Sequence, residues 1–238
     1  MKKKILVINP VATSEWNESD AEYLRKAASS DTLVELVNIE RGPTTIESFY
    51  DENFAIPAIL EVVKENKNSF DGIMINCFAD PGINGAKEIC NIPVTGPGES
   101  SMLMATLLGN KFSVVSVKKN VVPMFEIKAR AIGLTKKLAS IEYINISVSE
   151  LERDRTKTVN EVVKSIEKAV KEKCAEVIIL GCTGMLSLYT EVVRRVNVPV
   201  IEPAATALKT LEMLIDLRLN HSKIGLYTYP VFDKIKGY

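Results

Sequence analysis

The sequence has few of the residues on which acid–base and metal chemistry usually depend. It contains a single histidine, His221, which we expect in a solvated loop near the C-terminus where it could not easily serve as a base. Histidines do not cluster with carboxylates, and neither GxGxxG nor a P-loop is present. Metal and nucleotide chemistry therefore have little support.

Charge and hydrophobicity exclude two further classes of protein. The chain of 238 residues carries 30 basic and 30 acidic side chains, so its formal net charge is zero and it predicts no broad basic surface for nucleic acid. The apolar run at 5–8 follows three lysines but stops at Asn9 and Pro10, which is too short for a signal peptide. We expect this run to be a first β-strand, and neither nucleic acid nor a membrane as partner.

The four cysteines show none of the spacings of a disulfide scaffold, a CxxC pair or a zinc site. This usage predicts reduced thiols in the cytoplasm. Cys90 and Cys174 extend apolar helical stripes, and we interpret both as small buried hydrophobic residues. Cys77 and Cys182 differ from them because they occupy matching places in a repeat.

The repeat consists of two similar segments, 71–77 and 176–182. Each runs from an acidic residue through apolar residues to a cysteine, and an Asn-x-Pro-Val block follows at 91–94 and 197–200. The offset between the copies stays near 105 residues. A duplication of this kind predicts one thiol in each half, with both thiols facing a shared cleft. Packing alone would not require matched polar loops after both cysteines.

Strands and helices alternate along the chain, which predicts an α/β fold with parallel sheets. An apolar stripe at 56–63 predicts one helix, with Pro57 in an early helical position. A second stripe at 159–170 predicts another helix, which a capping box of Thr158 and Glu161 would begin. The expected strands are residues 5–8, 33–37, 73–75, 93–94, 112–117, 141–144, 177–180 and 198–201.

These elements divide into two pseudo-symmetric lobes, each a small parallel sheet of about four strands flanked by helices. We expect residues 1–96 plus 206–238 to form the first lobe and residues 97–205 the second. The helix at 99–108 and the final helix at 204–219 are expected to be exchanged between the lobes. Ligands of such sheets bind beyond the carboxyl ends of the strands, where Cys77 and Cys182 lie.

Two opposed thiols can invert a carbon centre. One thiolate removes a proton from a carbon acid, and a protonated thiol on the other face returns one. We expect helix N-termini beyond the strands to lower the thiol pKa toward neutrality, with Asp80 and Pro81 as the helix start after Cys77. The enolate charge needs donors, for which backbone N–H groups after each cysteine are plausible, together with the side chains of Asn9, Ser116 and Thr183.

Three further segments allow two interpretations each. The turn at 96–101, with Gly98 and Glu99, either holds a carboxylate or carbonyl oxygen or only starts a helix. Glu202 either bonds near Cys182 or caps the last helix, and we favour the cap. The loop at 41–48 either shapes the mouth of the cleft or is a turn before the next helix.

The motifs resemble the Asp/Glu/hydantoin racemase superfamily, nearest its hydantoin and allantoin racemase branch. The similar segments are 77–82 (CFADPG), 181–185 (GCTGM), 41–48 and 8–10 (INP), and the likeness spans nearly the whole chain. It implies a racemase independent of pyridoxal phosphate or other cofactors, with Cys77 and Cys182 as acid and base. It also implies that Asn9 and the residues flanking the cysteines, Phe78, Thr183 and Gly184, line the pocket, with Asp80 nearby.

The sequence departs from that branch at three places near the expected pocket. Val11 replaces the second asparagine of Asn-Pro-Asn, Ser116 and Val117 replace Thr-Thr, and Thr183 replaces alanine. Gly184 stands where amino-acid racemases often carry His or Glu. A cyclic ureide such as a 5-substituted hydantoin or allantoin is therefore favoured over a free amino acid.

Several alternatives stay open at this stage. They are an aspartate or glutamate racemase, a cis-trans isomerase or decarboxylase of the same superfamily, and a non-catalytic small-molecule binding protein on the two-lobed scaffold. The last predicts affinity without turnover. Paired α/β lobes of this size often associate, so we also expect a homo-oligomer.

Overall fold

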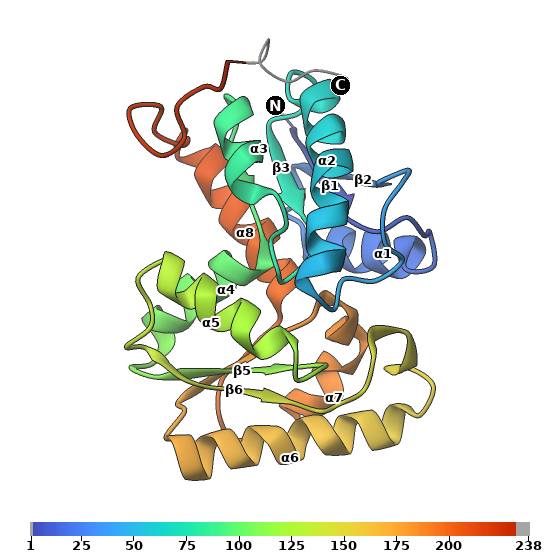
Figure 1. The fold of residues 1–238 in the computed structure, drawn as a ribbon, viewed down its shortest axis with the longest axis vertical. Coiled ribbons are helices and arrows are strands. Elements are labelled where there is room, and N and C mark those ends of the chain that lie inside the picture. Colours follow the sequence, from blue (N-terminus) through green and yellow to red (C-terminus); the bar gives the residue numbers. More distant parts are fainter. Residues whose placement is uncertain (1, 232–238) are drawn as a thin grey trace.

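The computed structural model describes residues 2–231 and contains two parallel four-stranded sheets (Figure 1). The first sheet has the order β2-β1-β3-β4 and the second the order β6-β5-β7-β8, so the two halves share one topology. This arrangement confirms the predicted α/β fold. The strands are β1 (Lys3–Asn9), β2 (Thr32–Asn38), β3 (Gly72–Ile75), β4 (Val94–Thr95), β5 (Phe112–Ser116), β6 (Leu138–Tyr143), β7 (Val177–Leu180) and β8 (Val200–Ile201).

The repeat read from the sequence is a repeat of structure. Beyond β3, the N–H of Asn76 donates to the carbonyl of Ile8 at 2.8 Å, and beyond β7 the N–H of Gly181 donates to the carbonyl of Val115 at 2.7 Å. Each bond extends the central strand pair by one residue. Each motif cysteine follows directly, so the same backbone path delivers both thiols to the carboxyl edge of a sheet.

Helices cover both faces of each sheet, and the alternation of strand side chains explains why. In the first sheet Leu6 and Ile73 face α2 and α3, whereas Val7 and Met74 face α1 and α8. The helices are α1 (Asn17–Ala27), α2 (Phe49–Asn66), α3 (Ile83–Ile89), α4 (Pro97–Leu108), α5 (Val121–Ala131), α6 (Arg155–Lys173), α7 (Tyr189–Val193) and α8 (Pro203–Asp216), with 3-10 turns η1 (Val148–Glu150) and η2 (Thr183–Leu188).

Helices α4 and α8 each cross to the other sheet. Met102 and Ala105 of α4 pack with Val177 in the core of the second sheet, although α4 follows the last strand of the first. Leu208 and Leu211 of α8 pack in turn against the first sheet. In Figure 1, α8 returns from the lower lobe to lie along the upper one. The final helix stops at Asp216, three residues before the predicted end, and Arg218 has a left-handed φ of 53°.

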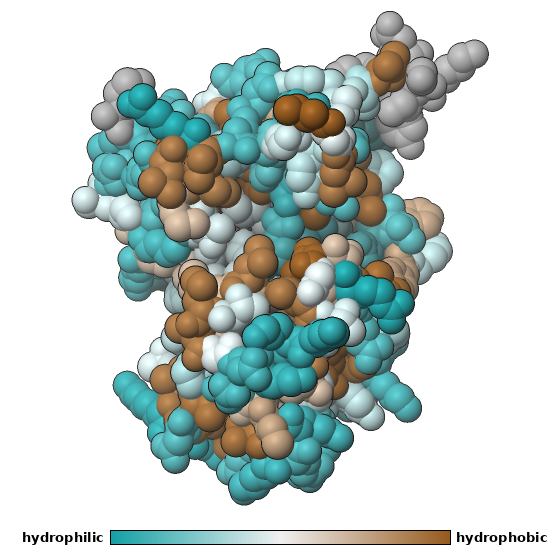
Figure 2. Space-filling model, turned by 90° about the vertical axis from the view of Figure 1, so that its left-hand side faces the viewer, coloured by the Kyte–Doolittle hydropathy of each residue, from teal (hydrophilic) through white to brown (hydrophobic). Residues whose placement is uncertain are grey.

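The molecular surface carries apolar side chains on the side of α4, α5 and α8. Figure 2 shows several apolar areas on this face, separated by hydrophilic surface. The exposed apolar residues of these helices are Leu103, Leu107, Leu108, Ile127 and Met213, and the exposed Leu217 directly follows α8. Within residues 2–231, no helix combines the length and hydrophobicity of a membrane-crossing segment.

Helix α2 begins eight residues before Pro57, so the predicted early position of this proline is wrong. The Ser48 hydroxyl caps the helix by accepting the N–H of Asp51 at 3.2 Å. Pro57 cannot donate to the carbonyl of Asn53, but both residues are exposed, so solvent can satisfy that carbonyl. A proline on the outer face is therefore tolerated inside this helix.

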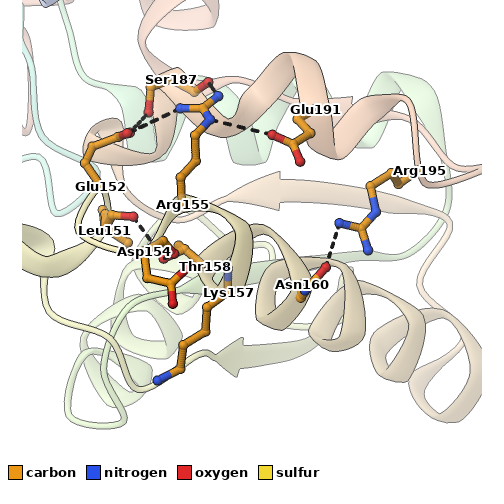
Figure 3. Close-up of polar contacts among 10 residues, drawn as sticks. All are labelled: Leu151, Glu152, Asp154, Arg155, Lys157, Thr158, Asn160, Ser187, Glu191 and Arg195. Carbon is orange, nitrogen blue, oxygen red and sulfur yellow. Dashed lines mark hydrogen bonds and ion pairs between the residues drawn. The ribbon is translucent and has the colours of Figure 1, made fainter.

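The predicted capping box at Thr158 is also wrong, because α6 begins earlier. Asp154 is the N-cap and accepts the N–H of Lys157 at 3.0 Å (Figure 3). The buried Thr158 hydroxyl instead donates to the carbonyls of Leu151 at 2.9 Å and Asp154 at 3.0 Å. Thr158 thus fastens the preceding loop to the helix.

Two predictions of exposure are reversed. Cys174, expected in the core, is exposed because it ends α6 in a left-handed conformation with φ 57°. His221, expected in solvent, is partly buried, and its Nε2 accepts the N–H of Val94 at 2.8 Å. Burial lowers the pKa of His221 to about 4, with help from the nearby positive charges of Lys87 and Lys223. Cys90 is buried as expected.

Candidate active site

The two motif cysteines border one pocket between the lobes. Cys77 lies two residues beyond β3 and Cys182 two residues beyond β7, and both line a pocket of about 60 Å³, called the cysteine pocket here. Both also line a smaller neighbouring space of about 30 Å³, the apolar cavity, whose wall includes Phe78 and Phe125. The fold thus brings together two thiols that are 105 residues apart in the sequence.

The predicted lowering of the thiol pKa is wrong for both cysteines. Burial raises the pKa of the Cys77 thiol far above its ordinary value and that of Cys182 to about 12. Backbone N–H groups of Ala79 and Gly184 oppose this shift by bonding to the sulfur atoms, but desolvation outweighs them. In the free protein both thiols are therefore protonated at neutral pH.

Asp80 does not cap the helix that follows Cys77, as the sequence suggested. Its Oδ1 accepts the N–H of Gly98 and its Oδ2 that of Glu99, both at 2.8 Å, so Asp80 caps α4 instead. Lys128 adds an ion pair at 3.0 Å to the fully buried carboxylate. The anion site at residues 96–101 is thus filled by a side chain of the protein itself.

Asn9 lies in the wall of the cysteine pocket, but its amide is already engaged. Its Nδ2 donates to Asp20 Oδ2 at 3.0 Å and to Asn17 Oδ1 at 3.4 Å. Its Oδ1 accepts from Asn76 Nδ2 at 2.8 Å. Asn9 therefore organises a polar network beside the thiols, and the expected donation to an enolate would require one of these bonds to break.

Ser116 lies at the apolar cavity with Phe78, and its buried hydroxyl donates to the carbonyl of Gly181 at 2.8 Å. The Thr183 hydroxyl is less engaged, because its closest acceptor, the carbonyl of Asn76, is 3.5 Å away. Thr183 lines both spaces beside the cysteines. Of the predicted side-chain donors, Thr183 is therefore the one whose hydroxyl forms only a weak hydrogen bond within the protein.

Gly184 keeps the wall close to Cys182. A Cβ at this position would lie 3.4 Å from the Cys182 sulfur and 3.3 Å from side-chain atoms of Leu151 and Val148. Gly98 is more restricted still, since a Cβ there would meet the carbonyl oxygen of Phe78 at 2.2 Å. These glycines allow close packing around the two cysteine loops.

Glu99 and Glu202 lie away from the thiols. Glu99 forms a largely buried ion pair with Lys87 at 2.6 Å. Glu202 accepts the N–H groups of Ala204 at 2.9 Å and Ala205 at 2.7 Å, which confirms the predicted cap of the last helix. Neither carboxylate lines the cysteine pocket.

Asp20 and Asn76 belong to the pocket wall but were not predicted from the sequence. Asn76 Nδ2 approaches Asp20 Oδ2 at 3.3 Å, and both residues line the cysteine pocket. Burial raises the pKa of Asp20 to about 6. The position of Asn76 directly before a motif cysteine could have indicated it. No sequence signal marks Asp20, because its place in the pocket wall depends on how α1 packs in the folded protein.

The loop at 41–48 contributes to the mouth of the cleft, one of its two proposed roles, since Thr45 and Ile46 line the cysteine pocket. Asp20 and the two thiols are the ionisable side chains of this wall. Among the described residues that line it, none is a lysine, an arginine or a histidine. The pocket therefore suits an uncharged ligand better than a carboxylate.

Comparison with known proteins identifies the family. The family described as Asp/Glu/Hydantoin racemase matches residues 5–211. The chain is 35% identical to a hydantoin racemase from Pseudomonas sp. (strain NS671) over 95% of this chain and 92% of that protein. It is 34% identical to a hydantoin racemase from Paenarthrobacter aurescens over 95% and 97% of the two chains.

A solved structure shows the same architecture. The allantoin racemase from Klebsiella pneumoniae superposes with a TM-score of 0.91 at 31% identity, covering 97% of this chain and 94% of that one. The residues matched by the family, 5–211, include both motif cysteines. The chain is therefore a member of the Asp/Glu/hydantoin racemase family of isomerases.

Proposed function

We propose that the protein racemises a hydantoin-like cyclic ureide, a 5-substituted hydantoin or allantoin, by proton transfer between Cys77 and Cys182. The observation that carries the proposal is the position of both thiols on one small pocket, whose wall contains no cationic side chain among the described residues. The names of the relatives, hydantoin racemase and allantoin racemase, support the same substrate class.

The proposed reaction is a balanced exchange of protons at one carbon. The thiolate of one cysteine takes the proton from C5, so that a C–H bond breaks and an S–H bond forms. The electron pair moves into the adjacent carbonyl as an enolate. The opposite thiol then gives its proton to the other face of C5, which inverts the centre and leaves the two cysteines in exchanged protonation states.

The high thiol pKa has two effects on this chemistry. It makes the thiolate rare at neutral pH, but it also makes the thiolate a stronger base once formed, closer in pKa to a carbon acid. Backbone N–H groups of Ala79, Gly184 and Met185 stabilise the sulfur charge. A neutral ring adds no second negative charge to the pocket before the proton is removed.

An amino acid fits this wall less well than a cyclic ureide. Its α-carboxylate would enter a desolvated pocket beside Asp20 with no lysine, arginine or histidine among the described lining residues to pair with it. Burying an unpaired carboxylate costs several kcal/mol. A hydantoin ring offers N–H and C=O groups in place of that charge, which disfavours aspartate and glutamate as substrates.

Proton exchange in deuterium oxide tests the proposal. Proton NMR should show loss of the C5–H signal for hydantoins or allantoin and a much slower exchange for aspartate and glutamate. Cys77→Ser and Cys182→Ser should each lower racemisation by at least about 100-fold, the range of a lost general acid or base. Cys174→Ser is the matched control, because this exposed thiol lies outside both cavities.

Other outcomes would select the alternatives. Unchanged exchange in both serine variants would exclude the two-cysteine mechanism. Carbon dioxide release from arylmalonates, or isomerisation of maleate, would favour another reaction of the superfamily. Ligand affinity without any exchange would favour a binding protein.

Three accompanying features stay predictions. Independence from cofactors predicts full activity after dialysis against EDTA. Self-association predicts a mass above 26.3 kDa in light scattering. A cytoplasmic location agrees with four free cysteines and is tested by cell fractionation.

A further inference from the structure

A larger space opens beside the cysteine pocket. This side cavity has a volume of about 460 Å³, against about 60 Å³ for the cysteine pocket. Both spaces are lined by Trp16, Asp20, Val148, Thr183 and Gly184, so they adjoin one another between the lobes. A ligand centred between the thiols therefore has room to extend in this direction.

The other space that adjoins the cysteine pocket, the apolar cavity, offers little room. The apolar cavity measures about 30 Å³, and side chains such as Phe78, Met124 and Phe125 surround it. Phe78 and Phe125 meet edge to face with ring centroids 4.8 Å apart. A C5 substituent longer than a few atoms must therefore leave the cysteine pocket through the side cavity.

The side cavity is acidic, but two of its four carboxylates are already neutralised. Glu22 pairs with Lys26 at 2.5 Å. Glu152 pairs with Arg155 at 3.3 Å and accepts the hydroxyl of Ser187 (Figure 3). Figure 3 also shows that Arg155 forms an ion pair with Glu191. The guanidinium of Arg155 is therefore already bound to carboxylates of the protein.

Asp20 and Glu15 are the two carboxylates of the side cavity that are not neutralised by an ion pair. Among the described residues, no lysine or arginine forms an ion pair with either of them. Asp20 lies where the two cavities meet, and its Oδ2 accepts both Asn9 and Asn76, whereas its Oδ1 takes part in neither bond. A positive group entering the side cavity would find an oxygen available there.

We propose that the side cavity binds a C5 substituent that ends in a protonated amine or guanidine, with Asp20 as its partner. This inference rests on the proposed function, because it places the C5 carbon between the thiols. Glu15 at the outer rim extends the same negative field. Asp20 thus selects the substrate, while the thiols act on it.

A pair of substrates of equal shape isolates the charge. The 5-(3-guanidinopropyl)hydantoin and 5-(3-ureidopropyl)hydantoin differ by a terminal nitrogen and oxygen, and only the first is cationic. The wild-type enzyme should show about fivefold higher kcat/KM for the guanidine, the upper end of the effect of an exposed ion pair, because Asp20 is partly buried. The preference should decrease between about 0.05 M and 0.5 M salt, because the Debye length shortens from roughly 14 Å to roughly 4 Å.

Variants assign the preference to Asp20. Asp20→Asn should bring the ratio of the two kcat/KM values to within about twofold, and Glu15→Gln should reduce it less. Glu18→Gln is the matched control, because it removes a carboxylate from the same helix outside the cavity. The ratio should stay at its wild-type value in this control.

Binding measurements separate this inference from the proposed function. Racemic ligands can be titrated calorimetrically into wild-type protein, since racemisation leaves their composition unchanged. Equal affinity and equal turnover for the guanidine and the urea would overturn the inference and leave the racemase intact. Failure of every hydantoin to exchange its C5 proton would overturn the proposed function, and the affinity ratio would still decide whether the cavity selects a cation.

Discussion

The carboxylate of Asp80 accepts the backbone N–H of Gly98 at 2.8 Å and thereby ties the two halves of the molecule together. Asp80 follows Cys77 by three residues in the first lobe, whereas Gly98 opens the helix that covers the second sheet. Lys128 of α5 adds an ion pair to the same carboxylate. One buried side chain therefore holds a cysteine loop against two helices, α4 and α5.

Replacing this carboxylate should be costly. We expect Asp80→Ala to lower the free energy of unfolding by about 3–5 kcal/mol, because it leaves Lys128 and two helix N–H groups without their partner. Urea denaturation measures the change. Glu22→Gln, which breaks the exposed pair with Lys26, is the control and should leave the free energy of unfolding nearly unchanged, because solvent screens an exposed ion pair. Equal effects of the two substitutions would contradict the role given to Asp80.

The rate of racemisation should rise with pH across the neutral range and beyond. Because burial raises the pKa of both thiols, that of Cys182 to about 12, the thiolate fraction grows roughly tenfold per pH unit from pH 7 to 10. Polarimetry at low substrate gives kcat/KM, with the Cys77→Ser, Cys182→Ser double variant as the blank for spontaneous racemisation. A plateau reached below pH 8 would show that the thiols ionise more easily.

Asp20→Asn should stabilise the protein at neutral pH. The folded protein holds the Asp20 proton up to about pH 6, whereas the group ordinarily releases it near 3.8, so stability falls as the pH rises between these values. The variant lacks this loss and should be more stable by on the order of 2 kcal/mol above pH 6. The advantage should vanish below about pH 4. Urea denaturation of both proteins at several pH values measures the difference in their free energies of unfolding. A difference that does not change with pH would contradict the raised pKa of Asp20.

Alkylation should distinguish the four thiols. Cys174 is exposed, whereas Cys90 is buried and burial raises its pKa to about 11. Iodoacetamide at pH 8 should therefore modify Cys174 first and leave racemisation unchanged, because this thiol is remote from the pocket. Mass spectrometry of peptides during the reaction, combined with activity, provides the measurement. Early modification of Cys77 would contradict its raised pKa.

Much of the fold could be predicted because the spacing of apolar residues and the internal repeat indicate the same strands. The bounds of β7 match the prediction, and the matching backbone bonds of Asn76 and Gly181 show why the repeat was informative. Helix starts were less predictable. The caps at Ser48 and Asp154 precede the apolar stripes by several residues, and the stripes alone indicated where each helix becomes buried.

The site was predicted less completely, for a physical reason. The thiol pKa depends on how closely the folded chain buries the sulfur, and this cannot be read from the residues next to Cys77 or Cys182. Asp20 illustrates the same point, because nothing around it resembles a motif. Its carboxylate becomes part of the pocket wall only when α1 folds back beside Asn9.

The crossing of α4 and α8 has a consequence for the order in which the nascent chain can acquire its structure. Ile5 and Val7 are synthesised long before α8, the last helix among the described residues, yet α8 supplies much of the cover on their face of the sheet, beside α1. The part of this face that α8 covers therefore stays open to water until α8 has been synthesised. A prematurely terminated polypeptide would expose that face, which makes it a target for chaperones and proteases.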